Sequence, residues 1–289
     1  MSEIVLRTEK LCYTYSAGTM IENTAIKDIN IDIEKGELIG IIGHTGSGKS
    51  TLIQHFNGLL KPTGGKIYVN NSEIWENKKN IRQVRFTVGL CFQYPEYQLF
   101  EETVEKDIAF GPKNMGLSDE EIHKRVREAV SFVGLSEEYL DKSPFDLSGG
   151  QKRRVAIAGV MAMQPQILIL DEPCAGLDPK GRDTVLSLIR DYREKTGSTV
   201  MIVSHSMEDI SKIATKVLVL NKGEVAMYGS VDEVYSHGEE LASMGLSIPE
   251  MTKLFIKLRE KGYNVRTNIY TVEEGRKELL SLLGKGEKQ

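Results

Sequence analysis

The segment that decides the fold reads Gly43-His44-Thr45-Gly46-Ser47-Gly48-Lys49-Ser50. It follows the apolar run Leu38–Ile42 and precedes a helical pattern from Thr51 to about Asn57. A glycine-rich turn between a buried strand and a helix lets successive backbone N–H groups point inward, and the start of the helix adds a favourable dipole. The segment therefore predicts a cradle for the phosphates of a nucleotide.

Two side chains of this segment have the chemistry to act on those phosphates. We expect the Lys49 ammonium to reach the β- and γ-phosphates, and the Ser50 hydroxyl to ligate Mg²⁺. A plain glycine-rich turn is the alternative, but the flanking strand and helix leave it little weight. The residues predicted to bind the nucleotide here are Gly43, His44, Thr45, Gly46, Ser47, Gly48, Lys49, Ser50 and Thr51.

Two acids follow the apolar run Ile167–Leu170. The carboxyl ends of buried parallel strands are where α/β folds place ligand sites. We expect Asp171 to hold Mg²⁺ through water and Glu172 to act as the general base for an attacking water. A solvated strand end is the alternative interpretation of the pair.

Two further polar residues also come directly after apolar strands. His205 follows Val200–Val203, and Gln93 follows the short run Val88–Phe92. We expect His205 to contact the γ-phosphate and Gln93 to orient water or touch Mg²⁺. A structural histidine and a surface glutamine are the alternatives.

A second glycine-rich segment, Leu147-Ser148-Gly149-Gly150-Gln151, is too far along the chain to belong to the first cradle. A glycine-rich helix start is itself an anion site. The chain therefore carries two half-sites, and it needs a partner to close either.

Composition excludes several classes of protein. The chain has 289 residues, with 40% hydrophobic and 27% charged residues, which is typical of a soluble globular protein. Its net charge of −4 provides no basic field, so no nucleic-acid partner is expected. Cys12, Cys91 and Cys174 lack metal-ligand spacing and indicate free thiols. Residues 1–15 lack the apolar core of a signal peptide, and no apolar run is long enough to span a membrane.

The hydrophobic pattern predicts an α/β fold with two kinds of sheet. Continuous apolar runs, such as Leu38–Ile42, suit a parallel sheet buried on both faces. Ile29, Ile31 and Ile33 alternate with polar residues, as in a half-exposed antiparallel sheet beside the nucleotide. A mostly helical insert is expected at about 95–164, where Ser118 and Glu121 resemble a capping box.

The chain changes character after about Val234, and residues 235–289 read as a helical extension. Two capping-box patterns, Ser247 with Glu250 and Thr271 with Glu274, each precede an amphipathic helix. The apolar stripes either pack on the chain's own core or contact a partner ATPase, which would make the extension a dimerisation element. The stripe residues are Met251, Leu254, Phe255 and Leu258 on the first helix, and Val272, Arg276, Leu279, Leu280 and Leu283 on the second.

Together these motifs resemble the ATP-binding cassette family, in the family's own order, from about Ile4 to Val234. Gly43–Ser50 is similar to its Walker A motif, Ile167–Glu172 to Walker B, and Leu147–Gln151 to the signature motif. Gln93 resembles the Q-loop glutamine, Gly176-Leu177-Asp178 the D-loop and His205 the switch histidine. The chain departs from the family at Cys174, where Ser or Thr is usual, and we expect little effect.

The resemblance implies a P-loop nucleotide-hydrolase core with an antiparallel β subdomain, a helical signature subdomain and ATP with Mg²⁺ as ligands. Residues 1–234 would form the cassette domain. Tyr15 resembles the aromatic that stacks on adenine, with Tyr13 as the alternative. In a head-to-tail dimer, the signature would contact ATP on the other subunit through Ser148, Gly149, Gly150 and Gln151.

A finer resemblance lies in Phe92–Phe100, Glu101–Val104 and Ala109–Pro112, which look like the ATPases of energy-coupling-factor importers of vitamins or cobalt. The early loop Tyr13–Thr19 is similar to the second of their two ATPases. This implies a second ATPase subunit, with a heterodimer favoured, a transmembrane coupling subunit and a separate membrane substrate-binding subunit. The chain would then lie peripherally on the cytoplasmic face of the membrane.

The segment after Gln93 is unusually aromatic, which has two interpretations. It can pack in the core, or it can form a docking groove for a helix of the membrane partner. The residues predicted to dock the partner are Tyr94, Tyr97, Leu99 and Phe100.

Two other functions compete with transport. A soluble cassette ATPase acting on translation or DNA would usually carry two cassettes or a coiled-coil insert, and neither is present. A nucleotide-binding regulator without hydrolysis is disfavoured by the intact Glu172 and His205. The sequence leaves open the transported solute and the choice between homodimer and heterodimer.

Overall fold

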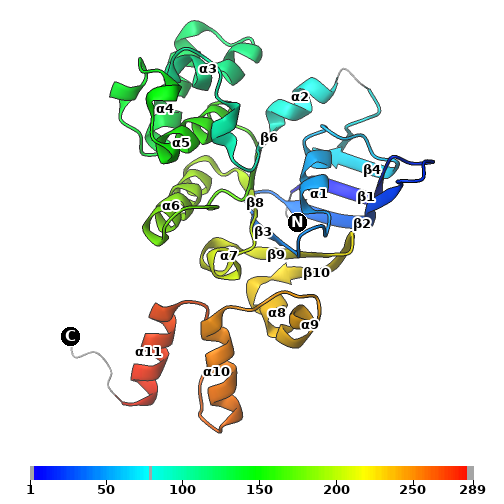
Figure 1. The fold of residues 1–289 in the computed structure, drawn as a ribbon, viewed down its shortest axis with the longest axis vertical. Helices are drawn as coiled ribbons and strands as arrows, with labels where there is room; N and C mark the ends of the chain where they lie inside the picture. The colour runs from blue at the N-terminus through cyan, green and yellow to red at the C-terminus, as the bar shows by residue number, and fades with distance from the viewer. Residues whose placement is uncertain (1–2, 78–79, 285–289) are drawn as a thin grey trace.

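A mixed β-sheet forms the centre of the molecule (Figure 1). The computed structural model describes residues 3–77 and 80–284. Within them the central sheet has six strands in the order β10-β9-β3-β8-β7-β6, and only the β9–β10 pair is antiparallel. The strands are β3 (Leu38–Ile42), β6 (Val88–Cys91), β7 (Ile167–Asp171), β8 (Thr199–Val203), β9 (Lys216–Asn221) and β10 (Glu224–Ser230).

Burial explains why the apolar runs become inner strands. Every residue of β3, β7 and β8 is buried, as expected of parallel strands that are covered on both faces. The predicted α/β core is confirmed. Because these strands are parallel, the segments that follow them emerge at the same edge of the sheet.

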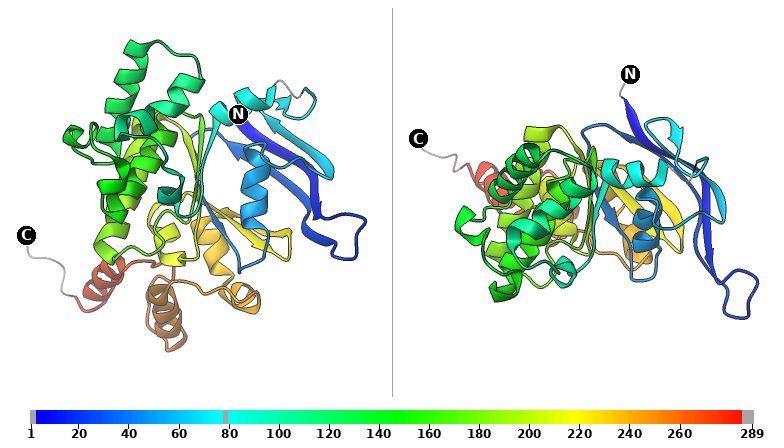
Figure 2. Two further views of the ribbon diagram at one scale, coloured as in Figure 1. Left: turned by 45° about the horizontal axis from the view of Figure 1, so that its top comes forward. Right: turned by 90° about the horizontal axis from the view of Figure 1, so that it is seen from above.

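An antiparallel sheet in the order β2-β1-β4-β5 lies beside this core (Figure 2). Its strands are β1 (Ile4–Tyr15), β2 (Asn23–Glu34), β4 (Gly64–Val69) and β5 (Ser72–Glu73). In β2, the buried Ile29, Ile31 and Ile33 alternate with exposed polar residues, as predicted. Helix α1 (Lys49–Phe56) packs between the two sheets and shares one apolar cluster with both. A short helix, α2 (Asn80–Thr87), follows β5.

Helices cover the other face of the central sheet and continue into a helical subdomain, drawn in green in Figure 1. Ser118 caps α4 by accepting a hydrogen bond from the Glu121 backbone N–H, which confirms the predicted cap. The elements are η1 (Pro95–Gln98), α3 (Val104–Asn114), α4 (Asp119–Phe132), η2 (Glu137–Tyr139), η3 (Pro144–Asp146), α5 (Gly149–Met161), α6 (Pro179–Thr196) and α7 (Met207–Ile213).

The chain ends in α8 (Val231–Ser236), α9 (Gly238–Ser243), α10 (Glu250–Glu260) and α11 (Val272–Leu282). Thr271 and Glu274 form the predicted capping box of α11. The predicted cap at Ser247 is wrong, because α10 begins two residues later with Pro249 at the N-cap. A residue before proline is disfavoured in the helical conformation, so Ile248 cannot open the helix. The Ser247 hydroxyl instead lies 2.5 Å from the Lys253 ammonium.

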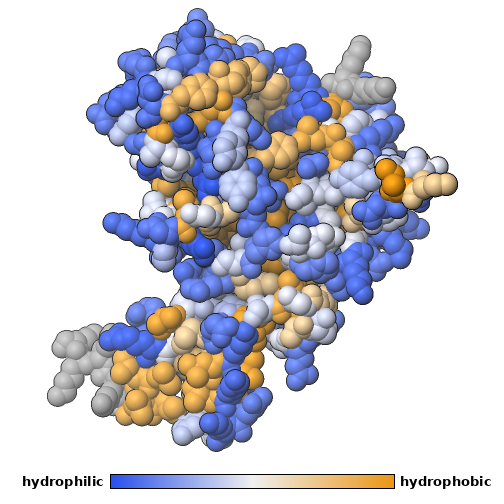
Figure 3. Space-filling model, viewed as in Figure 1, coloured by the Kyte–Doolittle hydropathy of each residue, from blue (hydrophilic) through white to orange (hydrophobic). Residues whose placement is uncertain are grey.

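The apolar stripe of α10 packs mainly within the extension itself. Phe255 is fully buried in a small cluster with Val265 and Ile269, while Leu254 stays 43% exposed. Apolar surface remains over α10 and α11, as Figure 3 shows at the lower left. By contrast, Tyr235, Leu241 and Ile248 belong to the main core. The domain boundary expected at Val234 therefore falls inside α8. Residues 285–289 of the predicted extension lie outside the described residues.

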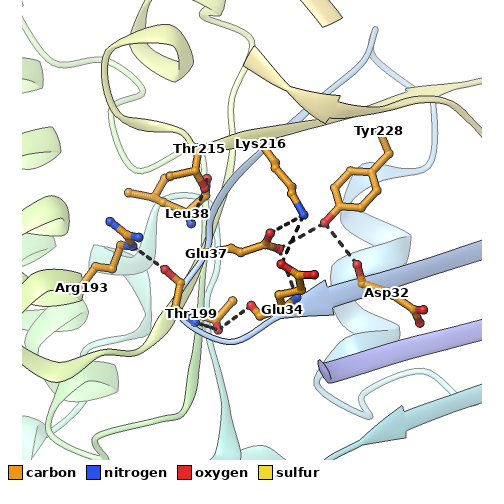
Figure 4. Close-up of polar contacts among 10 residues, drawn as sticks. Asp32, Glu34, Glu37, Leu38, Arg193, Thr199, Thr215, Lys216 and Tyr228 are labelled. Carbon is orange, nitrogen blue, oxygen red and sulfur yellow. Dashed lines mark hydrogen bonds and ion pairs between the residues drawn. The ribbon is translucent and has the colours of Figure 1, made fainter. Parts of the chain in front are cut away.

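A buried polar junction joins the two sheets at the edge from which β3 starts (Figure 4). The Glu37 carboxylate, 9% exposed, accepts the Glu34 backbone N–H and lies 2.5 Å from the Lys216 ammonium. The Tyr228 hydroxyl donates to it over 3.3 Å. This carboxylate therefore ties β2 and β3 to β9 and β10.

We predict that Glu37→Ala lowers the free energy of unfolding by about 2 kcal/mol, because hydrogen bonds to a buried charged group are lost and Lys216 loses its close partner. The denaturation midpoint of the full-length chain measures this. Glu3→Ala is the matched control, since the Glu3–Lys35 ion pair is exposed and should contribute little. Equal midpoints for the two variants would contradict the role assigned to the junction.

Candidate functional site

The glycine-rich segment forms a tight loop between β3 and α1. Gly48 has a φ of +103°, and a Cβ there would lie 2.5 Å from the Ala25 carbonyl oxygen. Gly46 has a φ of +81°. Since side chains rarely adopt these backbone conformations, glycine is required to bend the loop around a ligand.

Lys49 and Ser47 are the polar side chains of the loop that lie buried. The Lys49 ammonium is nearly buried and donates to the carbonyl oxygens of Gly43 at 2.7 Å and His44 at 3.0 Å. Burial lowers the pKa of Lys49, whereas the nearby Glu172 and Asp171 raise it. The buried Ser47 hydroxyl has no hydrogen-bond partner among the described residues. The Lys49 ammonium thus lies across the loop with neutral carbonyl oxygens as its hydrogen-bond partners. A positive charge in this position fits a site that binds phosphate oxygens.

Two of the metal ligands predicted from sequence, Ser50 and Asp171, are in contact, whereas no contact among the described residues joins Gln93 to them. The Ser50 hydroxyl, at the start of α1, donates to the Asp171 carboxylate at the end of β7 over 3.3 Å. Burial raises the pKa of Asp171, and the Ser50 hydrogen bond and Lys49 oppose this. A hydroxyl and one carboxylate beside a phosphate cradle fit Mg²⁺, which usually takes its other ligands from water and phosphates.

Glu172 has an uncommon backbone conformation, and the pKa of its carboxyl is raised. Its φ of +51° lies in the left-handed region, and its N–H donates to the Val203 carbonyl over 3.0 Å. Burial first, and then the neighbouring Asp171, raise the pKa of Glu172 to about 7. Its Oε1 has no hydrogen-bond partner among the described residues. A strained, partly desolvated carboxyl with a free oxygen is suited to accept a proton from water.

His205 and Gln93 approach the same edge from neighbouring strands. The His205 Nε2 lies 3.3 Å from the Glu172 Oε1, although the pair lacks hydrogen-bond alignment. Burial, and then Lys49, lower the pKa of His205, which favours the neutral ring. Gln93 is exposed two residues after β6, whose Cys91 pairs with Leu170 of β7. The backbone that leads to Gln93 thus ends beside the strand that carries the acids.

The geometry favours Tyr15 over Tyr13 as the residue that would face the adenine ring of the nucleotide. The Tyr15 hydroxyl lies 3.2 Å from the Thr51 hydroxyl of α1, and its ring is partly exposed. Tyr13 packs edge-on between the Tyr15 ring and the buried His55, at 4.7 Å from each. Sequence analysis missed His55, because a single histidine inside a helix carries no distinctive pattern.

The second glycine-rich segment opens α5 with a capping box. The Ser148 hydroxyl accepts the Gln151 backbone N–H, and the Gln151 side chain accepts the Ser148 N–H. Gly149 and Gly150 are exposed, and no described atom would lie within 4 Å of a Cβ at either. This helix start lines a hollow with Leu177 and Asp178 that contains no residue of the phosphate loop. One chain therefore does not bring its own two anion sites together.

The aromatic segment after Gln93 borders a groove of about 320 Å³ between η1, α2, α3 and α5. Tyr97 is 84% exposed, and Tyr94 and Phe100 are also exposed. Leu99 is partly buried against the main core but still lines the groove. Phe110 of α3 packs edge-on against Phe100 at 5.0 Å. Leu99, Phe100 and Phe110 give the groove an apolar wall, whereas Tyr94 and Tyr97 lie outside its lining.

Sequence analysis also missed Arg153, which follows the second glycine-rich segment. Its buried guanidinium forms a bidentate pair with Glu96, at 2.9 and 3.2 Å, and donates to the Ala175 carbonyl oxygen. It thus connects α5 to the aromatic segment and to the turn after Glu172. Glu96 faces inward and does not belong to the groove's polar rim.

Comparison with known proteins agrees with this geometry. The family model described as ABC transporter matches residues 26–175. A protein of Clostridium tetani named energy-coupling factor transporter ATP-binding protein EcfA2 is 55% identical over 96% of each chain. A protein of the same name from Listeria innocua is 46% identical over 97% of this chain and 99% of its own.

Two solved structures are also similar. One is cbiO1 from Clostridium perfringens, described as part of the ABC transporter complex cbiONQ, with a TM-score of 0.75, 40% identity and coverage of 90% of this chain and 98% of that chain. The other is the dimeric ATP-binding cassette MJ0796 bound to ADP and Pi. Its TM-score is 0.69, with 29% identity and coverage of 78% of this chain and 98% of that chain.

We predict that Glu172→Gln retains nucleotide binding and loses hydrolysis by roughly two to four orders of magnitude, because an amide cannot accept the proton. Phosphate release and nucleotide affinity, measured on the same preparation, check this. Glu224→Gln is the control, since it makes the same chemical change at an exposed carboxylate of β10 that is paired with Lys27. Normal turnover by Glu172→Gln would refute its assignment as the base.

Proposed function

Because the chain belongs to the ABC transporter family and is an ATP-hydrolysing subunit of an energy-coupling-factor transporter, we propose that it powers import of a vitamin or metal ion as half of a head-to-tail nucleotide-sandwich dimer. The observation that carries the proposal is the separation of the two anion sites. The phosphate loop and the start of α5 line different hollows of one chain. A second cassette would supply the missing half of each site.

The chain's own residues divide the work of hydrolysis. Loop N–H groups and Lys49 bind the phosphates, and Ser50 and Asp171 hold Mg²⁺. When bound, Mg²⁺ neutralises the charge that develops on the phosphate oxygens. Glu172 takes the proton of the attacking water, while His205 and Gln93 fix the γ-phosphate and the water. Tyr15 stacks on the adenine.

The partner's signature closes the site over the γ-phosphate. Ser148, Gly149 and Gly150 present the exposed start of α5, where backbone N–H groups and the helix dipole favour an anion. Gln151 holds the Ser148 backbone through its capping contact. The MJ0796 cassette, which is dimeric with ADP and Pi, supports this arrangement by its similarity.

The groove beside η1 is the proposed docking site for a helix of the transmembrane coupling subunit. It combines the exposed rings of Phe100 and Phe110 with polar residues at its rim. The polar residues are Gln98, Asp107 and Asn114. Tyr94 and Tyr97 lie exposed beside the groove. None of the helices among the described residues is both long and apolar enough to cross a membrane. By similarity to the energy-coupling factor transporter ATP-binding proteins, the chain is proposed to lie peripherally on the cytoplasmic face, with a separate membrane subunit binding the solute.

A heterodimer with a second ATPase chain is the favoured assembly, and the C-terminal extension is proposed to add to its interface. The early Tyr13–Thr19 loop, which is similar to that of second ATPase subunits, supports this choice. The test is purification of the chain from detergent-solubilised membranes, followed by mass spectrometry of its partners. Solute uptake into vesicles that contain the complex, driven by ATP, then identifies the solute. A complex without another ATPase chain would overturn the heterodimer.

We predict that Ser148→Arg blocks closure of the dimer while the chain's own phosphate loop still binds ATP, because the bulky cation occupies the position of the partner's γ-phosphate. Sedimentation with ATP and Mg²⁺ and nucleotide titration of the monomer measure the two effects. Ser136→Arg, at the exposed cap of η2, is the control. Collapse of monomer affinity in Ser148→Arg would contradict a role in trans.

We also predict that Tyr97→Ala weakens assembly with the membrane subunit by about 2 kcal/mol or more, as for an exposed aromatic anchor beside the groove, and leaves ATP affinity close to wild type. Pull-down of the membrane complex and nucleotide titration check this. Tyr97→Phe keeps the ring and should retain assembly. Equal losses in both assays would mean that Tyr97 holds the fold, and an unchanged complex would place the docking surface elsewhere.

A further inference from the structure

The turn that carries His205 is fixed to the elements on both sides of it. The Ser204 N–H donates to the Ile41 carbonyl of β3, and the Ser206 N–H donates to the Ser204 hydroxyl. Ser206 then caps α7, which begins at Met207. Only one residue separates His205 from this helix, so a displacement of α7 displaces the histidine.

Helix α7 contacts α6, through the Lys212–Asp183 ion pair at 3.3 Å, and it also contacts β3 and α8. The contacts with β3 and α8 differ in kind. At β3, Ile210 fits over Gly40 so closely that a Cβ at Gly40 would lie 2.3 Å from the Ile210 side chain. At α8, the contact is with Tyr235, which is 1% exposed. Its hydroxyl donates to the Met207 carbonyl oxygen over 3.0 Å. The first contact is apolar packing, and the second is a single directional hydrogen bond.

Tyr235 belongs to a C-terminal unit that is held together by polar contacts. Its ring packs edge-on against Tyr270 at 5.6 Å, and the Tyr270 hydroxyl hydrogen-bonds to Asp232 of α8. The Thr252 hydroxyl of α10 donates to the Ile269 carbonyl oxygen over 2.6 Å. Contacts thus connect α10, through Ile269 and Tyr270, to Tyr235.

The same C-terminal unit reaches the catalytic edge directly. Residues 245–250 line a cavity of about 500 Å³ together with His44 and Thr45 of the phosphate loop and His205. Leu241 and Ile248 share the main core with Met207 and Ile210. The unit thus lies against the switch histidine and not only at the far end of the molecule.

We propose that Tyr235 is a positioning residue for ATP hydrolysis. Its hydroxyl fixes the Met207 carbonyl and thereby sets the position of His205 relative to Glu172. The C-terminal segment, through α8, then adjusts the hydrolysis rate without touching the nucleotide. This inference rests on the proposed roles of Glu172 and His205 in hydrolysis.

The test compares Tyr235→Phe, His205→Ala and the double variant in the full-length chain, assembled with the partners that purify with it. Tyr235→Phe keeps the buried ring and removes only the hydroxyl. We expect kcat for ATP with Mg²⁺ to fall about fivefold, which corresponds to about 1 kcal/mol, with KM unchanged. In the His205→Ala background the same change should have no further effect, since the two residues act in series.

Tyr192→Phe is the matched control. Tyr192 is also fully buried in the main core, but it lies near the end of α6, at the opposite edge of the sheet. Melting temperatures of both tyrosine variants show whether either loses stability. Unchanged turnover in Tyr235→Phe, or an equal loss in Tyr192→Phe, would overturn the proposal. An undiminished effect of Tyr235→Phe in the His205→Ala background would do so too. Normal turnover of His205→Ala would instead remove the proposed role of the histidine itself.

Discussion

The parallel register of β3, β7 and β8 is the constraint on which the rest of the structure depends. Leu38 pairs with Val200, and Asp171 pairs with Val203, so the strands end level with one another. The phosphate loop, the two acids and His205 follow these strands and therefore meet at one edge. A shift of one residue in β7 would turn Asp171 to the opposite face of the sheet and away from Ser50. Continuous burial of all three strands specifies that register.

The same burial that builds this edge also tunes its acid–base groups. Desolvation raises the pKa of Glu172 to about 7 and lowers that of Lys49. Each group opposes the shift of the other, because their charges attract. The left-handed backbone of Glu172 adds a strain of roughly 1–3 kcal/mol. The Glu172 N–H bond to Val203 helps hold this conformation. A carboxyl that keeps a free oxygen under these conditions is held ready for a water molecule.

The parts of the fold that could be predicted from the sequence are those coded by local pattern. β3 matches the predicted run Leu38–Ile42, and the caps at Ser118 and Thr271 follow from the residues three positions later. The prediction of a cap at Ser247 was wrong, because the effect of Pro249 on Ile248 outweighs the capping pattern.

Contacts between distant segments leave no local signal in the sequence. Arg153 with Glu96 and Tyr235 with Met207 are examples, since each member alone is an ordinary charged or aromatic residue. The phosphate loop, the two acids and His205 could be placed because each lies at or directly after the end of a recognisable strand. Tyr15 lies within β1, and the second glycine-rich segment follows η3, so their relation to the site rests on the resemblance.

The two buried links to the catalytic edge differ in strength, and the difference fits their places in the fold. Arg153 holds Glu96 of the aromatic segment and the Ala175 carbonyl with one planar guanidinium. Removing one partner of a buried ion pair typically costs about 3–5 kcal/mol, so this link keeps α5 and the aromatic segment together as one body. The Tyr235 bond to Met207 is neutral, and such a bond typically contributes only about 1 kcal/mol. Arg153 therefore ties the segment beside the groove firmly to α5 and to the turn after Glu172. The C-terminal segment meets α7 through this neutral hydrogen bond and through the apolar packing of Leu241 and Ile248. A link without a charged contact suits graded adjustment and not obligatory coupling.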